Sequence, residues 1–162
     1  MSPQNFPEAD SREKDPATNA LAAEVLPRPP AVRHDAGVVG VGIDLESVAR
    51  LKAAAERNGD AFMEKVFAPR EIEVCHSRGA HAWESFAARW AAKEAFSKAL
   101  GTGIGGSVAM TDFIVVAGNN GEPVAEVSPR GKAAMEKISA TNALVSLSHT
   151  KEFAAAIVLL TR

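Results

Sequence analysis

The sequence lacks the features that mark secreted, membrane-spanning and general nucleic-acid-binding proteins. Its single cysteine, Cys75, cannot form an internal disulfide, so folding does not need an oxidising compartment. No apolar run approaches the roughly 20 residues of a transmembrane helix, and the N-terminus has no apolar stretch of the signal-peptide kind. The formal net charge of −2 leaves no basic excess to neutralise phosphates. We therefore expect a cytoplasmic protein that binds neither membranes nor nucleic acid.

Proline and glycine divide the chain into two unequal parts. Residues 1–36 hold six of the nine prolines and no glycine. Proline denies the backbone its helix and sheet hydrogen bonds, so we predict a disordered extension over residues 1–36. The whole chain is 46% hydrophobic and 23% charged, which is ordinary for a globular protein. Residues 37–162 are therefore expected to form one domain.

Hydrophobic periodicity in residues 37–162 predicts helices mixed with hairpin strands. The predicted strands are 38–45, 113–117, 124–127, 144–148 and 153–161; the predicted helices are 47–57, 61–75 with a break at Pro69, 83–100 and 129–140. Hairpins beside helices favour an α+β fold with a mainly antiparallel sheet. The strand 153–161 is apolar on both faces, so we expect it to be central and covered on each side.

The helix predicted over residues 83–100 is apolar nearly all round, which indicates a long buried helix against the sheet. Glu94 falls in the middle of a face that also carries Trp83 and Trp90. A carboxylate there is costly unless it is paired or bound to a metal. An ion pair with Lys98, one turn further on, is the simpler explanation.

Two further cations on the same helix favour a functional explanation. Arg89 and Lys93 are four residues apart, and like charges at this spacing repel each other. Taken singly, each could extend its aliphatic side chain along the helix and place its charged group in solvent. Together with Lys98 they favour a site for an anion beside a carboxylate-bound metal.

A glycine-rich loop follows this helix. Residues 101–106 match the dinucleotide fingerprint G-x-G-x-x-G, but that fingerprint requires a strand before it and a helix N-terminus after it. Here the glycines follow a helix, so we reject a dinucleotide site. The loop can still approach a ligand closely, because it has few side chains.

Asp44 shares a strand face with Gly40 and Gly42. Either another backbone packs closely against this face, or a ligand lies there. Taken alone, capping of the helix that begins at Ser47 is the simpler role for Asp44. We interpret Glu46 as a surface residue, because the helix start turns it away from that face.

His149 directly follows the predicted strand 144–148 and continues its alternation. A lone histidine at such a position is more often structural than functional. Ser146 and Ser148 lie nearby, but neither lies in the strand-to-helix turn that exposes a catalytic serine. We therefore reject a serine–histidine triad.

Three stretches of the chain resemble motifs of one family. Residues 39–46 read V-G-V-G-I-D-L-E, residues 89–105 read R-W-A-A-K-E-A-F-S-K-A-L-G-T-G-I-G, and residues 145–150 read V-S-L-S-H-T. They resemble the short, holo-acyl-carrier-protein synthase branch of the phosphopantetheinyl transferases. The resemblance spans residues 37–162, and its middle motif is the specific one. Trp90 stands where many members have phenylalanine.

The resemblance implies an enzyme that moves 4′-phosphopantetheine from coenzyme A to a serine of an apo acyl carrier protein and releases 3′,5′-ADP. Asp44 and Glu94 would bind Mg²⁺, and Lys98 would contact phosphate at the reacting centre. The acceptor serine belongs to the carrier, so the chain needs no nucleophile of its own.

The resemblance also implies where the substrates bind. The implied coenzyme A contacts are Arg89, Lys93, Gly103, Gly105, Asn120, Pro123, His149 and Thr150. Arg50 would meet the acidic carrier, which is either a free protein or a domain of a fatty-acid synthase. A homotrimer with sites between neighbouring subunits is implied as well.

Two other functions stay open on the residues alone. One is a silent module that binds coenzyme A or docks a carrier without catalysis. The other is a different Mg²⁺-dependent nucleotide enzyme, which analysis of the products would expose.

Overall fold

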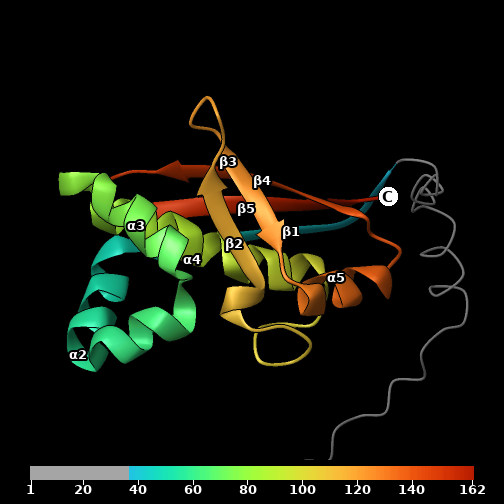
Figure 1. Cartoon of the computed structure of the whole chain (residues 1–162), viewed down its shortest axis with the longest axis horizontal. Coiled ribbons are helices and arrows are strands. Elements are labelled where there is room, and N and C mark those ends of the chain that lie inside the picture. Colours follow the sequence, from blue (N-terminus) through green and yellow to red (C-terminus); the bar gives the residue numbers. More distant parts are fainter. Residues whose placement is uncertain (1–36) are drawn as a thin grey trace, which may run out of the picture. The chain divides into compact units, whose positions relative to one another are not determined.

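A computed structural model describes residues 37–162, and the extension predicted over residues 1–36 lies outside this part. The elements are, in chain order, β1 (Val38–Ser47), α2 (Val48–Val66), α3 (Pro69–Ser77), the 3-10 helix η1 (Gly79–His81), α4 (Ala82–Ala99), the 3-10 helix η2 (Met110–Asp112), β2 (Phe113–Ala117), β3 (Pro123–Val127), α5 (Pro129–Glu136), β4 (Asn142–His149) and β5 (Phe153–Thr161) (Figure 1).

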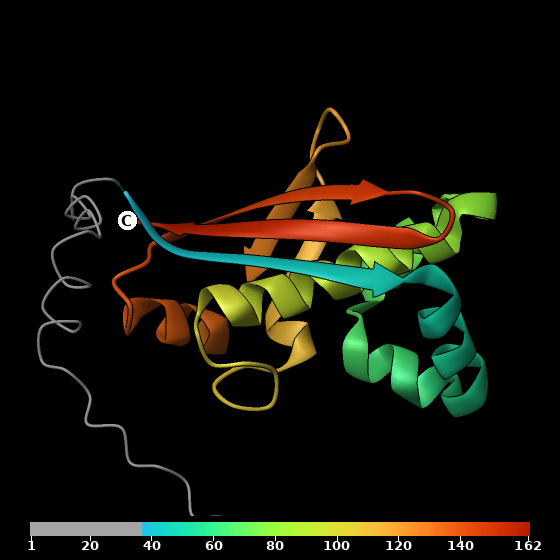
Figure 2. The same ribbon diagram turned by 180° about the vertical axis from the view of Figure 1, so that it is seen from behind.

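The strand pairs formed by residues 37–162 are all antiparallel. A three-stranded sheet has the order β1-β5-β4, and β2 pairs with β3 in a separate hairpin. Helix α4 packs along β1 and β5, and Figure 2 shows the three long strands with this helix behind and below them. The α+β fold with an antiparallel sheet on a long buried helix is confirmed. No helix within residues 37–162 is long and apolar enough to cross a membrane.

Small residues let β1 and α4 approach each other closely. A Cβ atom on Gly42 would overlap the carbonyl oxygen of Ala95, and one on Gly40 would overlap that of Ala99. Ala95 is completely buried in the core between helix and sheet. The bare strand face beside Asp44 is therefore explained by a helix backbone that packs directly against it.

Strand β5 is central, as predicted, but residues 37–162 cover only one of its faces. The register places alternate residues of the three strands on the face away from α4. We call this the outer face; its exposed apolar residues are Val41, Ile43, Leu45, Leu144, Phe153 and Ile157, between 38% and 66% exposed. Within the part of the chain that the structure describes, the expectation that β5 is covered on each side is wrong.

Two helices differ from the predicted boundaries. Helix α2 continues to Val66 through a kink at Gly59, whose φ of 68° is left-handed. Its N-cap is Ser47, whose hydroxyl accepts a hydrogen bond from the Arg50 amide at 3.3 Å. The capping role considered for Asp44 is therefore wrong. Helix α5 ends at Glu136, earlier than predicted.

Candidate active site

Asp44 and Lys98 meet between β1 and α4. Asp44 lies on the face of β1 that packs against α4, and its side chain is 16% exposed. The Lys98 ammonium donates to Asp44 Oδ1 at 2.7 Å and to the Ile43 carbonyl at 3.2 Å. Lys98 thus pairs with Asp44, which joins α4 to β1, and not with Glu94 as the simpler explanation had it.

Glu94 lies within electrostatic range of this ion pair. Its pKa is raised, first by burial and next by the negative charge of Asp44, while Lys98 opposes the rise. Two carboxylates that repel each other at a partly buried site favour the binding of a cation. We call Asp44, Glu94 and Lys98 the acid cluster.

The acid cluster fits Mg²⁺ better than a metal held by protein ligands alone. Within residues 37–162, no group of three or more histidine, cysteine, aspartate or glutamate residues could hold a metal ion. Mg²⁺ is commonly bound through one or two carboxylates, with water and substrate phosphate supplying the other oxygens. The two carboxylates of the acid cluster match that donor set.

Glu46 lies on the same face of β1 as Asp44 and is only 1% exposed, so its interpretation as a surface residue is wrong. The reason is that β1 continues to Ser47, which keeps Glu46 in the strand alternation. Its carboxylate accepts hydrogen bonds from Nε of Arg50 at 2.8 Å and from Nη2 of the same residue.

The glycine-rich loop follows the helical turn that carries Lys98. Gly101, Gly103 and Gly105 all have positive φ and exposed backbone. Because the loop begins where α4 ends, the helix before it turns its C-terminus toward the loop, which is the opposite of the dinucleotide fingerprint.

A cavity of about 510 Å³ lies beside the first half of α4. Its lining includes four basic side chains, together with the turn between β2 and β3: Arg78, His81, Arg89, His149, Gly121 and Pro123. We call this the basic cavity. It brings Arg89, Pro123 and His149 together, although they are far apart in the sequence. Arg78 and His81 were not predicted as site residues from the sequence. The observation that could have indicated them is that both are basic and lie in the short connection between two predicted helices.

Arg89 is held rigidly at the wall of the basic cavity. Its Nε donates to the Val115 carbonyl at 2.9 Å, and its Nη1 donates to the hydroxyl of Ser85 at 2.7 Å. No residue among 37–162 accepts a hydrogen bond from Nη2. A fixed guanidinium with donors to spare is suited to bind phosphate.

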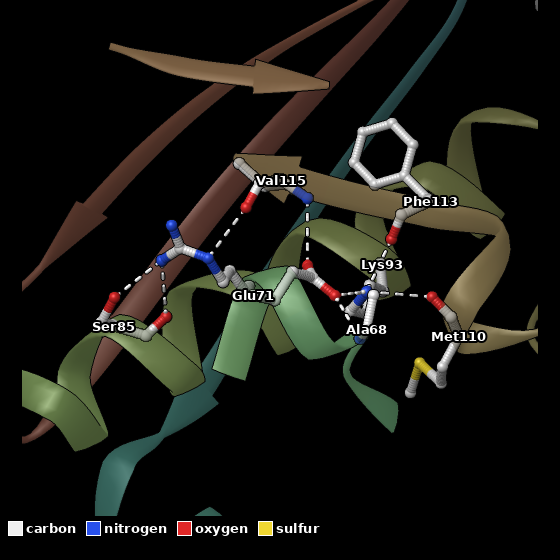
Figure 3. Close-up of polar contacts among 8 residues, drawn as sticks. Ala68, Glu71, Ser85, Lys93, Met110, Phe113 and Val115 are labelled. Carbon is white, nitrogen blue, oxygen red and sulfur yellow. Dashed lines mark hydrogen bonds and ion pairs between the residues drawn. The ribbon is translucent and has the colours of Figure 1, made fainter. Parts of the chain in front are cut away.

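Lys93 lies elsewhere, in contrast to the prediction that it lines a coenzyme A site. Its ammonium donates to Glu71 at 2.7 Å, to the Phe113 carbonyl at 2.6 Å and to the Met110 carbonyl at 3.1 Å (Figure 3). The side chains of Lys93 and Glu71 are both completely buried. An ammonium has three donors, so Lys93 has none left for a ligand. The second oxygen of Glu71 accepts from the Val115 amide at 3.0 Å.

Asn120 and Thr150 lie next to the lining of the basic cavity but outside it. The Asn120 amide donates to the Glu122 carboxylate in the turn between β2 and β3. The Thr150 hydroxyl accepts from the amides of Glu152 and Phe153 and so holds the turn between β4 and β5. In this structure both residues shape turns.

The acid cluster and the basic cavity are separate surfaces of one chain. At about 100° per residue, Lys98 is rotated by about 180° around α4 from Arg89, and Glu94 by about 140°. Within residues 37–162, the cavity lining includes no member of the acid cluster. Helix α4 thus carries two groups of functional side chains on different sides.

Comparison with known proteins gives one consistent family. The sequence model of the 4′-phosphopantetheinyl transferase superfamily matches residues 40–158. The chain is 42% identical over 116 residues to a holo-acyl-carrier-protein synthase of Ruminiclostridium cellulolyticum, covering 72% of this chain and 87% of that protein. It is 39% identical to the enzyme of that name from Koribacter versatilis, covering 76% of this chain and 98% of that protein.

Solved structures agree with this result. The chain resembles the Helicobacter pylori holo-acyl-carrier-protein synthase in complex with coenzyme A, with a TM-score of 0.66, 31% identity and coverage of 75% of this chain and 99% of that chain. It also resembles the synthase of Bacillus anthracis in complex with coenzyme A (3′,5′-ADP), with a TM-score of 0.64, 35% identity and coverage of 78% and 98%. The chain therefore belongs to the 4′-phosphopantetheinyl transferase superfamily, as a member of its holo-acyl-carrier-protein synthase family.

Proposed function

We propose that Asp44 and Glu94 bind Mg²⁺ and that the acid cluster carries out the transfer of 4′-phosphopantetheine from coenzyme A to a serine of an apo acyl carrier protein. The observation that carries this proposal is the contact of Lys98 with Asp44 between β1 and α4, with Glu94 near enough for the charge of Asp44 to raise its pKa. A bound Mg²⁺ ion would withdraw charge from the diphosphate of coenzyme A.

The side chains of the acid cluster have distinct roles in the proposed reaction. Glu94, or a water that it orients, accepts the proton of the acceptor serine. The serine oxygen forms a bond to the β-phosphorus, and the bond from that phosphorus to the leaving oxygen of 3′,5′-ADP breaks. Lys98, half exposed beside Asp44, is placed to neutralise charge on the departing phosphate.

The basic cavity is the proposed site for the nucleotide part of coenzyme A. Arg78 and Arg89 give it positive charge, and His81 and His149 add ring nitrogens that can form hydrogen bonds; this suits the phosphates of a nucleotide. The relative from Helicobacter pylori was solved in complex with coenzyme A. For Gly103, Gly105, Asn120 and Thr150 we keep the implied coenzyme A contacts as part of the proposal. Lys93 is left out, because its donors are used inside the core.

We propose a homotrimer, because residues 37–162 of one chain leave the outer face uncovered and keep the acid cluster apart from the basic cavity. The outer face exposes large apolar side chains such as Ile43 and Ile157 across three strands, which is typical of an interface. The acid cluster and the basic cavity lie on different sides of α4, so a neighbouring subunit is needed to bring them together. A ring of subunits supplies each acid cluster with the cavity of the next chain.

Arg50 is the proposed contact for the acidic carrier, which is a free protein or a domain of a fatty-acid synthase. Its side chain is 72% exposed on the first turn of α2. This reaction would place the chain in fatty-acid biosynthesis. The buried free thiol of Cys75 agrees with the cytoplasmic location that we propose.

The test is a transfer assay read by mass spectrometry. Purified protein, apo carrier, coenzyme A and Mg²⁺ are incubated, and the carrier is expected to gain the mass of one phosphopantetheine. Chelation of the metal, Asp44→Asn or Glu94→Gln should each abolish this gain. A carrier that stays unmodified at saturating substrate, with coenzyme A bound to the protein, would instead indicate a silent binding module.

A further inference from the structure

Glu46 is a buried acid to which the proposed reaction gives no role. It lies on the same face of β1 as Asp44, opposite Ala154 of β5, and its side chain is 2% exposed. A buried carboxylate needs a partner, and within residues 37–162 the partner is Arg50, four residues further on. The pair joins the end of β1 to the first turn of α2.

The geometry of the pair leaves part of Arg50 available. Glu46 engages one edge of the guanidinium, through Nε and Nη2. A guanidinium has five N–H donors, so the opposite edge retains three. That edge is on the solvent side, because the Arg50 side chain is 72% exposed while Glu46 is buried.

Arg50 also lies beside the acid cluster. Its pKa is raised, first by the hydrogen bond and charge of Glu46 and further by the charges of Asp44 and Glu94. The guanidinium is therefore held close to the acid cluster, to which the proposed function brings the acceptor serine. A free arginine side chain would lose much conformational entropy on binding a carboxylate, whereas one held by Glu46 is already oriented.

We propose that Glu46 is a positioning residue for carrier binding: its buried carboxylate holds the Arg50 guanidinium so that the outer N–H groups meet a carboxylate of the acyl carrier protein. This inference rests on the proposed function. It assigns Glu46 no contact with metal, coenzyme A or carrier.

Steady-state kinetics of four proteins test the inference: wild type, Glu46→Gln, Arg50→Ala and the double variant. Glu46→Gln should raise KM for the apo carrier about three- to tenfold, because an unheld arginine has to be ordered on binding. The kcat and the KM for coenzyme A should change less than about twofold, because neither depends on Arg50 orientation. In the Arg50→Ala background, Glu46→Gln should have no further effect on carrier KM.

The measurements are made at about 0.5 M salt as well as at low salt. Removing the charge of Glu46 also strengthens long-range attraction between Arg50 and an acidic carrier, and salt screens this opposing effect. Glu56→Gln is the matched control, because Glu56 pairs with Lys52 at 3.9 Å on the same helix and both side chains are largely exposed. It should leave carrier KM unchanged.

Several results would overturn the inference. One is an unchanged carrier KM in Glu46→Gln at both salt concentrations, and another is a further loss when Arg50 is already alanine. A raised Mg²⁺ requirement in Glu46→Gln would overturn it by placing Glu46 at the metal. If Glu46→Gln does not fold, Glu46→Met, which fills the buried space without a charge, takes its place. Wild type without any transfer would contradict the proposed function instead.

Discussion

Glu94 combines partial burial with a neighbouring carboxylate, a combination that is frequent at catalytic sites. The raised pKa means that the ionised form is disfavoured in the folded, metal-free chain. A residue of this kind is retained for function at some cost in stability.

Glu94→Gln is therefore expected to abolish transfer and to stabilise the metal-free protein slightly. Removing one of two repelling charges at a partly exposed site is worth about 0.5 kcal/mol, or a rise in Tm of about one to three degrees. Because the folded pKa is raised, protonation favours folding, and this contribution is lost as pH rises through that pKa. The gain should therefore be present at neutral pH and vanish below about pH 4, where the wild-type carboxyl is neutral too.

Thermal unfolding of both proteins in chelator, at neutral and acid pH, measures this difference. A Glu94→Gln protein that is less stable than wild type at neutral pH would show that the ionised carboxylate supports the fold.

Lys93 is expected to contribute to the free energy of unfolding and not to the transfer reaction directly. Lys93→Met leaves Glu71 charged and unpaired in the core, which costs about 3–5 kcal/mol. Lys98→Met is the matched control: its ion pair with Asp44 is half exposed, so it should cost about 1 kcal/mol or less while greatly reducing transfer. Urea unfolding together with the transfer assay separates the two lysines. Equal losses of stability would contradict the distinction.

At the scale of elements, the contact between β1 and α4 sets the distance between the two candidate metal ligands. Gly42, two residues before Asp44, lies in this contact against the carbonyl of Ala95, the residue after Glu94. Any side chain at this position has to push the strand away from the helix that carries Glu94.

Gly42→Ala is therefore expected to destabilise the protein by about 1–3 kcal/mol and to reduce transfer more than tenfold. The loss of transfer should exceed what unfolding explains, because a shift of about 1 Å at a reacting site can cost a hundredfold. Activity measured well below Tm checks this prediction. Full activity in a folded Gly42→Ala protein would contradict it.

The elements show what the sequence could and could not predict. The long helix was predicted within a residue at each end, because its apolar surface continues nearly all round. Strand β1 was predicted two residues short, since Glu46 and Ser47 look like a helix start until their cross-strand partners Ala154 and Phe153 are known. Lys93 was assigned to a ligand because its partner, Glu71, lies 22 positions away on another helix. A buried ion pair between two different helices does not appear in the hydrophobic periodicity of either helix.

At the scale of the whole molecule, the outer face is expected to be the subunit interface. Ile43→Asp places a charge on this face, at its most exposed apolar position, which should convert a trimer into a monomer and abolish transfer. Val124→Asp is the control, because Val124 is similarly apolar and exposed but belongs to the separate hairpin. Light scattering measures the molecular mass of each variant in solution and so its number of subunits. A trimeric Ile43→Asp protein would contradict the assignment.

A shared site also predicts complementation between two inactive variants. Glu94→Gln keeps its basic cavity, and Arg89→Ala keeps its acid cluster. Mixed and reassembled trimers should recover about a quarter of the wild-type rate, because random mixing pairs an intact cluster with an intact neighbouring cavity at that frequency. No recovery after verified subunit exchange would mean that both groups act within one chain.

The most direct measurement of the central claim is metal binding itself. Mn²⁺ has no competing signal in a protein, so its binding to wild type, Asp44→Asn and Glu94→Gln can be followed by electron paramagnetic resonance with coenzyme A present. One ion per chain is expected to bind wild type, and each single substitution should weaken that binding at least tenfold. Binding by both variants as tight as that of wild type would contradict a metal site shared by β1 and α4.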